Sequence, residues 1–203
     1  ELLKEGNIVA VKGIGGFHLA CNAMDIDAVS RLRKRKRREK EKPFAIMSGN
    51  MELIQQYCKV NEQEKELLLS TARPIVLLKK RLPCPIPDFV APNNRYLGVM
   101  LPYTPLHHLL MADEAISALV MTSGNISDEP LIKDNDEAMG RLSGIADYIL
   151  MHNRDIYNRC DDSVVQVIGS KKMVIRHARG YAPYPIMLDA EISRVLAVGS
   201  ELK

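Results

Sequence analysis

A dense run of positive charge is the first feature of this sequence that could do chemistry. Nine lysines and arginines lie between residues 31 and 42 with only two acidic residues, although the whole chain carries a net charge of only +3. Within this basic block (residues 31–42), Lys36, Arg38 and Lys42 stand just before an expected strand, where the chain must turn and side chains can converge. Arginine offers phosphate oxygens a planar fork, and lysine offers a compact charge. The block predicts an anion site, with a solvated helix end as the alternative.

Nucleic-acid binding is a further interpretation of the basic block. Such interfaces usually combine basic groups with aromatic side chains or a groove-reading helix. The chain has no Trp and only 5% aromatic residues. Double-stranded RNA binding therefore stays an alternative, because the block could follow a phosphate backbone.

Two small-residue turns could complete an anion site. Residues 13–16 (Gly-Ile-Gly-Gly) follow an apolar run, but they match neither GxGxxG nor the GxxxxGK[ST] loop. They fit a tight turn that needs positive φ, or a loop that a ligand can approach closely. Residues 123–125 (Ser-Gly-Asn) follow a short apolar strand and offer a hydroxyl, a permissive backbone and an amide. An ordinary turn is the alternative there.

The remaining polar groups carry weaker signals. Asp161-Asp162-Ser163 could hold Mg²⁺ or cap the start of a strand. The five histidines show no zinc-type spacing, and we expect His107 and His108 on a helix surface. The four cysteines lie at least 26 residues apart, which excludes CxxC pairs and favours a reduced, cytoplasmic chain.

The composition fits one large globular domain. The chain has 203 residues, of which 46% are hydrophobic, and no apolar run approaches the ~20 residues that a membrane helix needs. The first residues show no signal-peptide pattern and no initiator Met, so we expect a segment cut from a longer protein.

Strands and helices alternate along the expected order, which predicts an α/β fold with a twisted mixed sheet flanked by helices. One helix begins after Asp25, buries Ile26, Val29 and Leu32, and ends in the basic block before Pro43. The other expected helices are 51–59, 62–70, 106–111 and 134–142, and the expected strands are 7–12, 44–47, 75–79, 96–101, 118–121, 148–151 and the hairpin 164–168 with 173–177.

Several longer strings carry a family resemblance. The chain closely resembles the YrdC-like domain of the HypF family of hydrogenase maturation carbamoyltransferases, over nearly all of its length. The strings are KGIGGFHLAC (12–21), KPF (42–44), GVMLPYTPLH (98–107), TSGNISDEP (122–130), HNRDI (152–156), DDSVV (161–165) and RHARGYAP (176–183).

This resemblance implies a YrdC-like nucleotide-binding domain over residues 1–190, with a concave basic cleft. Residues 191–203 would be a linker and the start of a truncated carbamoyl-transfer domain. The family uses carbamoyl phosphate and ATP to form carbamoyl-AMP from carbamate. It passes the carbamoyl group to the partner HypE, on the way to the cyanide ligands of [NiFe] hydrogenase. Mg²⁺ is implied by the ATP chemistry, although its ligands stay unknown.

The resemblance also assigns roles to residues. The KxR and SxN motifs of the YrdC family match Lys36 with Arg38 and Ser123 with Asn125, so Lys36 and Arg38 are the expected catalytic cations. The resemblance also places Ser163 and Arg176 at the nucleotide site, with less support from the motifs. The expected nucleotide or phosphate site is Lys36, Arg38, Lys42, Ser123, Asn125, Ser163 and Arg176, and the expected carbamate pocket is Lys12, Gly13, Gly15, Gly16 and Phe17.

One departure separates this sequence from a second branch of the family. Threonylcarbamoyl-AMP synthases carry a Pro-Thr-Glu-Thr-like string where this chain has Lys12-Gly13-Ile14-Gly15. Without those hydroxyls, the pocket lacks partners for the polar groups of threonine. Threonylcarbamoyl-AMP synthesis in tRNA modification stays the alternative enzyme activity.

Overall fold

One mixed β-sheet runs through the computed structural model, which describes residues 1–38, 41–126, 129–185, 187, 193 and 195–196. Within these residues ten strands form the order β10-β9-β5-β6-β3-β7-β2-β1-β8, with β4 beside β5. The sheet contains both parallel and antiparallel pairs, which confirms the predicted mixed α/β sheet. The strands are β1 (Val9–Lys12), β2 (Phe17–Asn22), β3 (Ala45–Ser48), β4 (Cys58–Lys59), β5 (Ile75–Lys80), β6 (Tyr96–Met100), β7 (Ala118–Ser123), β8 (Tyr148–Leu150), β9 (Val164–Ile168) and β10 (Lys171–Arg176).

Side-chain caps fix where most helices begin. The Asp25 carboxylate accepts from the first turn of α1, and Asn61 forms a capping box with Glu64 in α3. Thr104 caps α4, whose first residue is Pro105. The helices are α1 (Ile26–Arg35), α2 (Met51–Tyr57), α3 (Glu62–Leu69), α4 (Pro105–Leu110) and α5 (Asn135–Leu142), with a 3₁₀ turn η1 (Asp88–Val90).

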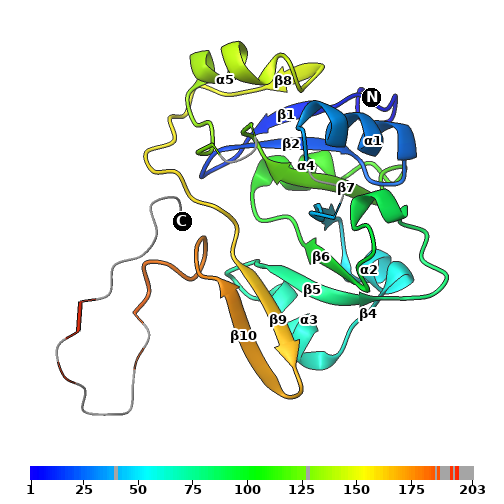
Figure 1. Ribbon diagram of the computed structural model, residues 1–203, viewed down its shortest axis with the longest axis vertical. Coiled ribbons are helices and arrows are strands. Elements are labelled where there is room, and N and C mark those ends of the chain that lie inside the picture. Colours follow the sequence, from blue (N-terminus) through cyan, green and yellow to red (C-terminus); the bar gives the residue numbers. More distant parts are fainter. Residues whose placement is uncertain (39–40, 127–128, 186, 188–192, 194, 197–203) are drawn as a thin grey trace.

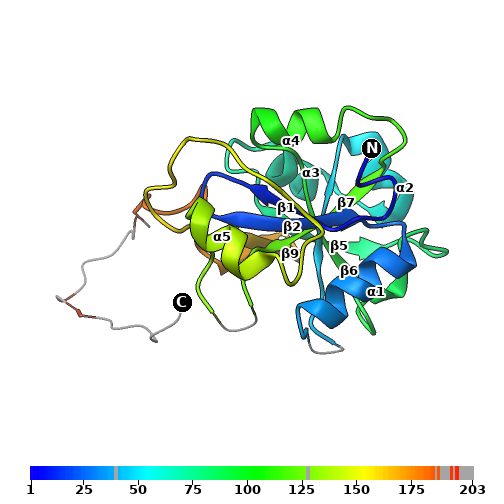
Figure 2. The ribbon, with the colours of Figure 1, turned by 90° about the horizontal axis from the view of Figure 1, so that it is seen from above.

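Helices cover both faces of the sheet at β1, β2 and β7. Figure 2 shows α1 and α5 on one side of these strands and α4 on the other. Leu19 and Val120 belong to the core cluster that includes residues of α1, whereas Ala20 and Met121 belong to the cluster that meets α4. Because side chains alternate along a strand, His18 and Ser123 lie on the α4 side with Ala20 and Met121.

The register brings the turns that the sequence singled out to one end of the sheet. Lys12 pairs with Phe17 across the β1–β2 hairpin, so residues 13–16 form its loop. His18 pairs with Ser123 in the antiparallel β2–β7 ladder. The β9–β10 hairpin and β8 with α5 occupy opposite ends of the strand order (Figure 1). The glycine turn and the Ser-Gly-Asn turn are therefore neighbours.

The basic block is not one continuous helix, contrary to expectation. Helix α1 ends at Arg35, and Arg37 adopts the left-handed conformation with φ 51°. The amide of Arg38 donates to the carbonyl of Arg33, and that of Arg37 donates to Lys34. This pair of bonds is a Schellman motif without its usual glycine. It reverses the chain at Lys36, which is buried, and leaves Arg37 exposed.

Several other element boundaries also differ from the expectation. Helix α2 ends at Tyr57 rather than residue 59, because Cys58 and Lys59 pair with β5 as β4. Ile26 is half exposed in the first turn of α1, so only Val29 and Leu32 of the expected apolar stripe are buried. Strand β10 begins at Lys171 and ends at Arg176, which makes the turn through Gly169 and Ser170 tight.

Much of the expected second segment, residues 191–203, lies outside the described residues. The boundary at residue 190 therefore stays a prediction. All four cysteines are free thiols. Among the described helices, none combines the length and the apolar character that a bilayer crossing requires.

Candidate functional site

Lys36 lies at the centre of a cluster formed with the Ser-Gly-Asn turn. Its ammonium donates to the carbonyl of Ser123 at 2.5 Å, to the carbonyl of Asn125 at 2.7 Å and to Asn125 Oδ1 at 2.8 Å. The Ser123 hydroxyl donates to the same Asn125 Oδ1 at 2.7 Å. The structure thus brings together three residues that the sequence predicted for one site, across 87 residues of chain. The Lys36 charge fixes this turn at the end of β7.

Arg38 reaches the same region from the turn after α1. Its guanidinium lies 4.7 Å from the centre of the Phe44 ring and donates to the carbonyl of Pro43 at 2.5 Å and weakly to Thr122 Oγ1 at 3.4 Å. Burial, followed by the nearby charges of Arg33 and Arg176, lowers the pKa of Arg38 to about 10. Like charges held close together favour an anion between them.

Two other predicted cations occupy different positions. The Lys42 side chain is exposed, and its backbone carbonyl rather than its ammonium joins the region, accepting from Arg33 at 2.8 Å and Arg38 at 3.2 Å. Arg176 is half buried at the end of β10 and donates to the carbonyl of Asp162 at 3.4 Å. Its charge is one of those that lower the pKa of Arg38.

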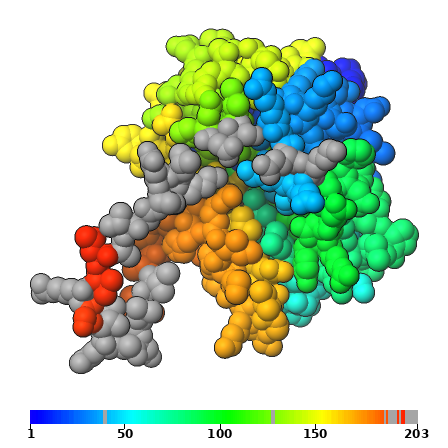
Figure 3. Space-filling view, in the orientation of Figure 1, coloured from blue at the N-terminus to red at the C-terminus, as the bar shows by residue number. Residues whose placement is uncertain are grey.

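Ser163 is buried completely where β9 begins, and its hydroxyl accepts from the amide of Ala178 at 2.8 Å. It therefore ties the start of β9 to the segment after β10. In Figure 3 the blue atoms of the N-terminal part lie beside the light-green atoms near α5, and the orange atoms of the β9–β10 hairpin lie on the same face.

The glycine turn packs against backbone on both sides. The Gly13 amide donates to the carbonyl of Gly16 at 2.9 Å, closing the loop. A Cβ on Gly15 would lie 2.4 Å from the carbonyl oxygen of Cys160. Lys12 is buried, and its ammonium donates to the carbonyl of His152 at 3.1 Å; Phe17 is fully buried. The expected pocket residues share one hairpin, with Lys12 bound to a neighbouring loop.

Gly124 joins the two turns, and its substitution gives a testable prediction. A Cβ at Gly124 would lie 2.6 Å from the carbonyl oxygen of Phe17, which already accepts from the Gly124 amide at 2.6 Å. We expect Gly124→Ala to separate β2 from the turn and to lower the unfolding free energy by about 2–4 kcal/mol, within the range of overpacking and strain. Urea unfolding measures this loss.

Gly140 provides the matched control for Gly124. It lies inside α5, and a Cβ there would have no atom within 4 Å. Gly140→Ala should stabilise the protein by about 0.5–1 kcal/mol, because alanine restricts the unfolded chain and favours helix. Equal effects of the two substitutions would contradict the close packing at Gly124.

A buried ion-pair network that no sequence motif predicted lies beside the turns. Asp162 Oδ1 accepts from Arg179 Nε at 2.8 Å, and Asp162 Oδ2 lies 3.1 Å from His18 Nε2. Arg179 also donates to the carbonyls of Ala72 and Arg73 and lies 3.4 Å from the centre of the Tyr103 ring. Burial alone would raise the pKa of Asp162, but His18 and Arg179 hold it well below its usual range.

His107 is buried, so its expected place on a helix surface is wrong. Its ring packs edge-on against Tyr103, with centroids 4.4 Å apart, and neither ring nitrogen has a partner among the described residues. Burial, with the nearby His18 acting in the same direction, lowers the pKa of His107 to about 3. The ring is therefore neutral in the folded protein at every pH near neutrality.

This burial predicts an acid sensitivity. The unfolded chain binds a proton at His107 near pH 6.5, whereas the folded chain does so only near pH 3, so stability falls as the pH drops through this window. Between pH 7 and pH 5 the contribution is about 2 kcal/mol. We expect His107→Met to remove that part of the pH dependence, as measured by urea unfolding at both pH values. An unchanged slope with pH would contradict the neutral, buried ring.

The described residues contain no group of three or more His, Cys, Asp or Glu side chains arranged to hold a metal. Asp162 is paired with His18 and Arg179. Mg²⁺ often binds through substrate phosphates and water, with only one or two carboxylates. The described His, Cys, Asp and Glu side chains therefore do not form a dedicated Mg²⁺ site.

The chain is similar to a family model and to longer curated relatives. The Sua5_yciO_yrdC model, described as telomere recombination, matches residues 1–178. The chain is 48% identical over 202 residues to carbamoyltransferase HypF of Synechocystis, covering 99% of this chain and 26% of that protein. It is 27% identical over 161 residues to a putative threonylcarbamoyl-AMP synthase of Methanocaldococcus jannaschii, covering 79% of this chain and 74% of that protein.

Solved structures agree with this assignment. A crystal structure of full-length HypF in a phosphate- and nucleotide-bound form has a TM-score of 0.87 and 54% identity, covering 94% of this chain and 30% of that one. P. abyssi Sua5 complexed with L-threonine shares the fold, with a TM-score of 0.76 at 20% identity, covering 87% of this chain and 52% of that one. The chain spans about a quarter of the length of the HypF relatives. It is a YrdC-like domain and belongs to the Sua5/YciO/YrdC family.

Proposed function

We propose that this chain binds ATP and forms carbamoyl-adenylate from carbamate, as part of a HypF-type carbamoyltransferase. The observation that carries the proposal is the Lys36–Ser123–Asn125 cluster, with Arg38 reaching the neighbouring Thr122. Support also comes from the HypF crystal structure that is described as phosphate- and nucleotide-bound and that resembles this chain.

The proposed reaction needs positioning and charge neutralisation rather than a covalent nucleophile. A carbamate oxygen attacks the α-phosphorus of ATP, a new O–P bond forms, and the bond from the α-phosphorus to the bridging oxygen breaks to release pyrophosphate. Arg38 and Arg176 would neutralise the phosphate oxygens, while Lys36 holds the Ser-Gly-Asn turn against the nucleotide. Ser123 and Asn125 would contact the phosphate and ribose, and Lys42 and Ser163 would border this site.

The carbamate would lie at the glycine turn, walled by Lys12, Gly13, Gly15, Gly16 and Phe17. Mg²⁺ would arrive with the phosphates of ATP. In the intact protein, the carbamate would derive from carbamoyl phosphate, and HypE would receive the carbamoyl group for the cyanide ligands of [NiFe] hydrogenase. We place this reaction in the cytoplasm, where thiols such as the four free cysteines stay reduced.

Two measurements test the proposal. Calorimetry should detect ATP binding, with and without Mg²⁺ and carbamoyl phosphate. In the intact protein, labelled pyrophosphate should exchange into ATP only when carbamoyl phosphate is present. The proposal fails if ATP does not bind, or if exchange is independent of carbamoyl phosphate.

Threonylcarbamoyl-AMP synthesis is the second candidate, because a putative threonylcarbamoyl-AMP synthase is similar over 79% of this chain. The same exchange assay separates the two activities. Stimulation by threonine with bicarbonate, and not by carbamoyl phosphate, would favour the synthase. The carbamoyl-adenylate proposal expects the reverse, because the glycine turn has no hydroxyls for threonine.

A further inference from the structure

Phe44 is a buried aromatic residue that contacts two arginines of the basic block. It is only 1% exposed, lies directly before β3, and its amide donates to the carbonyl of Val90 at 2.8 Å. The guanidinium carbon of Arg33 lies over the ring, 4.8 Å from its centre, and that of Arg38 lies over it at 4.7 Å. Both distances are within the ~6 Å range of a cation–π contact. One aromatic ring therefore supports two like charges.

The two guanidinium groups need such support because each is partly removed from water. Burial lowers the pKa of both arginines, and the charge of Arg33 lowers that of Arg38 further. The hydrogen bonds of Arg38 go to uncharged oxygens, which are the carbonyls of Lys42 and Pro43 and the hydroxyl of Thr122. The face of an aromatic ring carries a negative potential that attracts a cation. The ring thus offsets part of the free energy that it costs to hold Arg38 charged in this place.

Stacking on a ring leaves the edge of a guanidinium available to a ligand. A guanidinium has five N–H groups, and the hydrogen bonds of Arg38 to described residues use three of them. The side chain of Arg38 is half buried rather than enclosed, so its other two N–H groups remain available to oxygen atoms of an anion. Arg33 is only 8% exposed and donates to the carbonyls of Phe89 and Lys42. The two arginines therefore have different tasks beside the same ring.

We propose that Phe44 is a positioning residue of the ATP site. Its ring holds the guanidinium of Arg38 in one plane and stabilises the charge, so that the available N–H groups bind phosphate oxygens of ATP without first being ordered. Arg33 fixes the backbone around the ring. This inference rests on the proposed carbamoyl-adenylate function, in which Arg38 neutralises those oxygens.

Fluorination of the ring tests this role with almost no change of shape. In the intact protein, Phe44 is replaced by phenylalanines that carry one, two or three ring fluorines, which progressively weaken the negative potential of the ring face. In carbamate-dependent exchange of pyrophosphate into ATP, we expect the KM for ATP to rise with each fluorine, by about 5- to 10-fold in all, the effect of losing a partly desolvated cation–π contact. The KM for carbamoyl phosphate should change little. If Phe44 only fills the core, the KM for ATP should not follow the number of fluorines.

Two controls locate the effect. The ring of Phe89 is half exposed, and among the described residues no cation lies over it, so the same fluorinated residues at Phe89 should leave both KM values within about twofold. In Arg33→Gln, which removes the other cation from the Phe44 ring, the KM for ATP should still rise with fluorination, because Arg38 remains. Loss of this dependence in Arg33→Gln would assign the effect to Arg33 and overturn the proposal.

A second measurement does not depend on turnover. In the intact protein with ¹⁵N-labelled arginine, the Nε–H resonance of Arg38 should move stepwise with the number of fluorines on Phe44, and ATP should shift it further. A KM for ATP that is independent of fluorination, or an Arg38 resonance that does not respond to it, would overturn the role of Phe44 while the wild-type exchange stands. Absence of carbamate-dependent exchange in the wild type would instead reject the proposed function, and the role of Phe44 with it.

Discussion

Lys36→Met should reduce carbamate-dependent exchange of pyrophosphate into ATP by at least ~100-fold, the effect typical of removing a preorganised donor from a catalytic site. The substitution keeps the length of the side chain but removes three hydrogen bonds to oxygen atoms of Ser123 and Asn125. Those oxygens would then lie buried without their donor, and the turn would lose the geometry that the nucleotide needs. Exchange kinetics and ATP calorimetry on the intact protein measure the loss.

Lys34→Met is the matched control for Lys36. Lys34 lies two residues before Lys36, in the last turn of α1, and is exposed. Its loss should leave exchange within about twofold, because screened surface charges contribute little. Hydrolysis of carbamoyl phosphate by the intact protein should persist in both variants. Normal exchange in Lys36→Met would refute the assignment of the site.

Asp162→Asn should be the most destabilising of these substitutions, lowering the unfolding free energy by about 3–5 kcal/mol, the usual cost of breaking a buried ion pair. The change leaves the Arg179 guanidinium in the interior without its carboxylate. For a chain of this size, the melting temperature should fall by roughly 6–20 °C. Because the folded-state pKa of Asp162 is lowered, the stabilisation is present at neutral pH and is lost as the pH falls below about 4.

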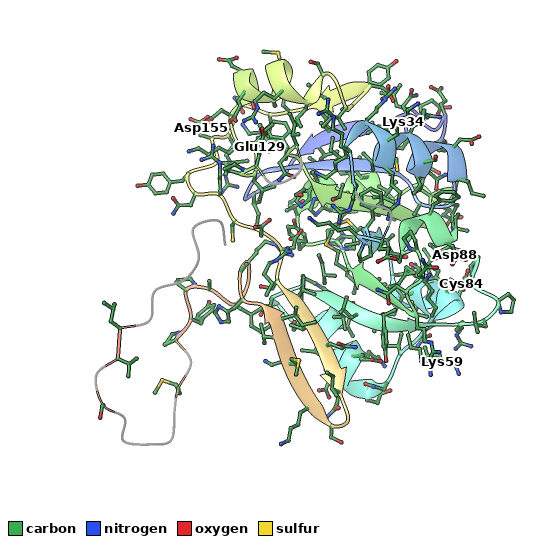
Figure 4. The ribbon with its side chains drawn as sticks, in the orientation of Figure 1. Lys34, Lys59, Cys84, Asp88, Glu129 and Asp155 are labelled. Carbon is green, nitrogen blue, oxygen red and sulfur yellow. The ribbon has the colours of Figure 1, made fainter. Side chains whose placement is uncertain are left out.

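Asp88 offers the comparison for Asp162. Its carboxylate lies 3.4 Å from the Lys80 ammonium, but the Asp88 side chain is 91% exposed and lies at the molecular surface (Figure 4). Asp88→Asn should change the unfolding free energy by less than about 1 kcal/mol. Thermal unfolding of the two variants at pH 7 tests the difference, and similar shifts in melting temperature would contradict the buried network.

The sequence was informative wherever a signal is local. Alternating apolar residues, caps such as Asn61 with Glu64, and the proline of α4 predicted most elements, because each depends on neighbours within a few positions. Family strings brought Lys36, Ser123 and Asn125 into one predicted site, and their hydrogen bonds agree with that grouping. The exposed Lys42 shows that residues close together in the basic block need not point their side chains toward the same site.

The features that could not be predicted from the sequence depend on tertiary contacts or on an unusual backbone conformation. His18 and Asp162 are 144 residues apart, and no spacing rule links a histidine on one strand to an aspartate before another. Helix α4 has only six residues, too few for periodicity to show which side of His107 is buried. The early end of α1 depends on a left-handed Arg37, a conformation that glycine normally signals.

The strand order also determines when parts of the sheet can form while the chain is being synthesised. Strand β5 waits for its parallel neighbour β9, because Ile75 pairs with Val164. At about 5–20 residues per second, a ribosome needs several seconds to make the intervening residues. Throughout that interval, amides and carbonyls on one edge of β5 are without partners, and an unpaired edge can pair with another chain. A nascent polypeptide that stalls before Val164 should therefore be the form most prone to aggregate and to recruit chaperones.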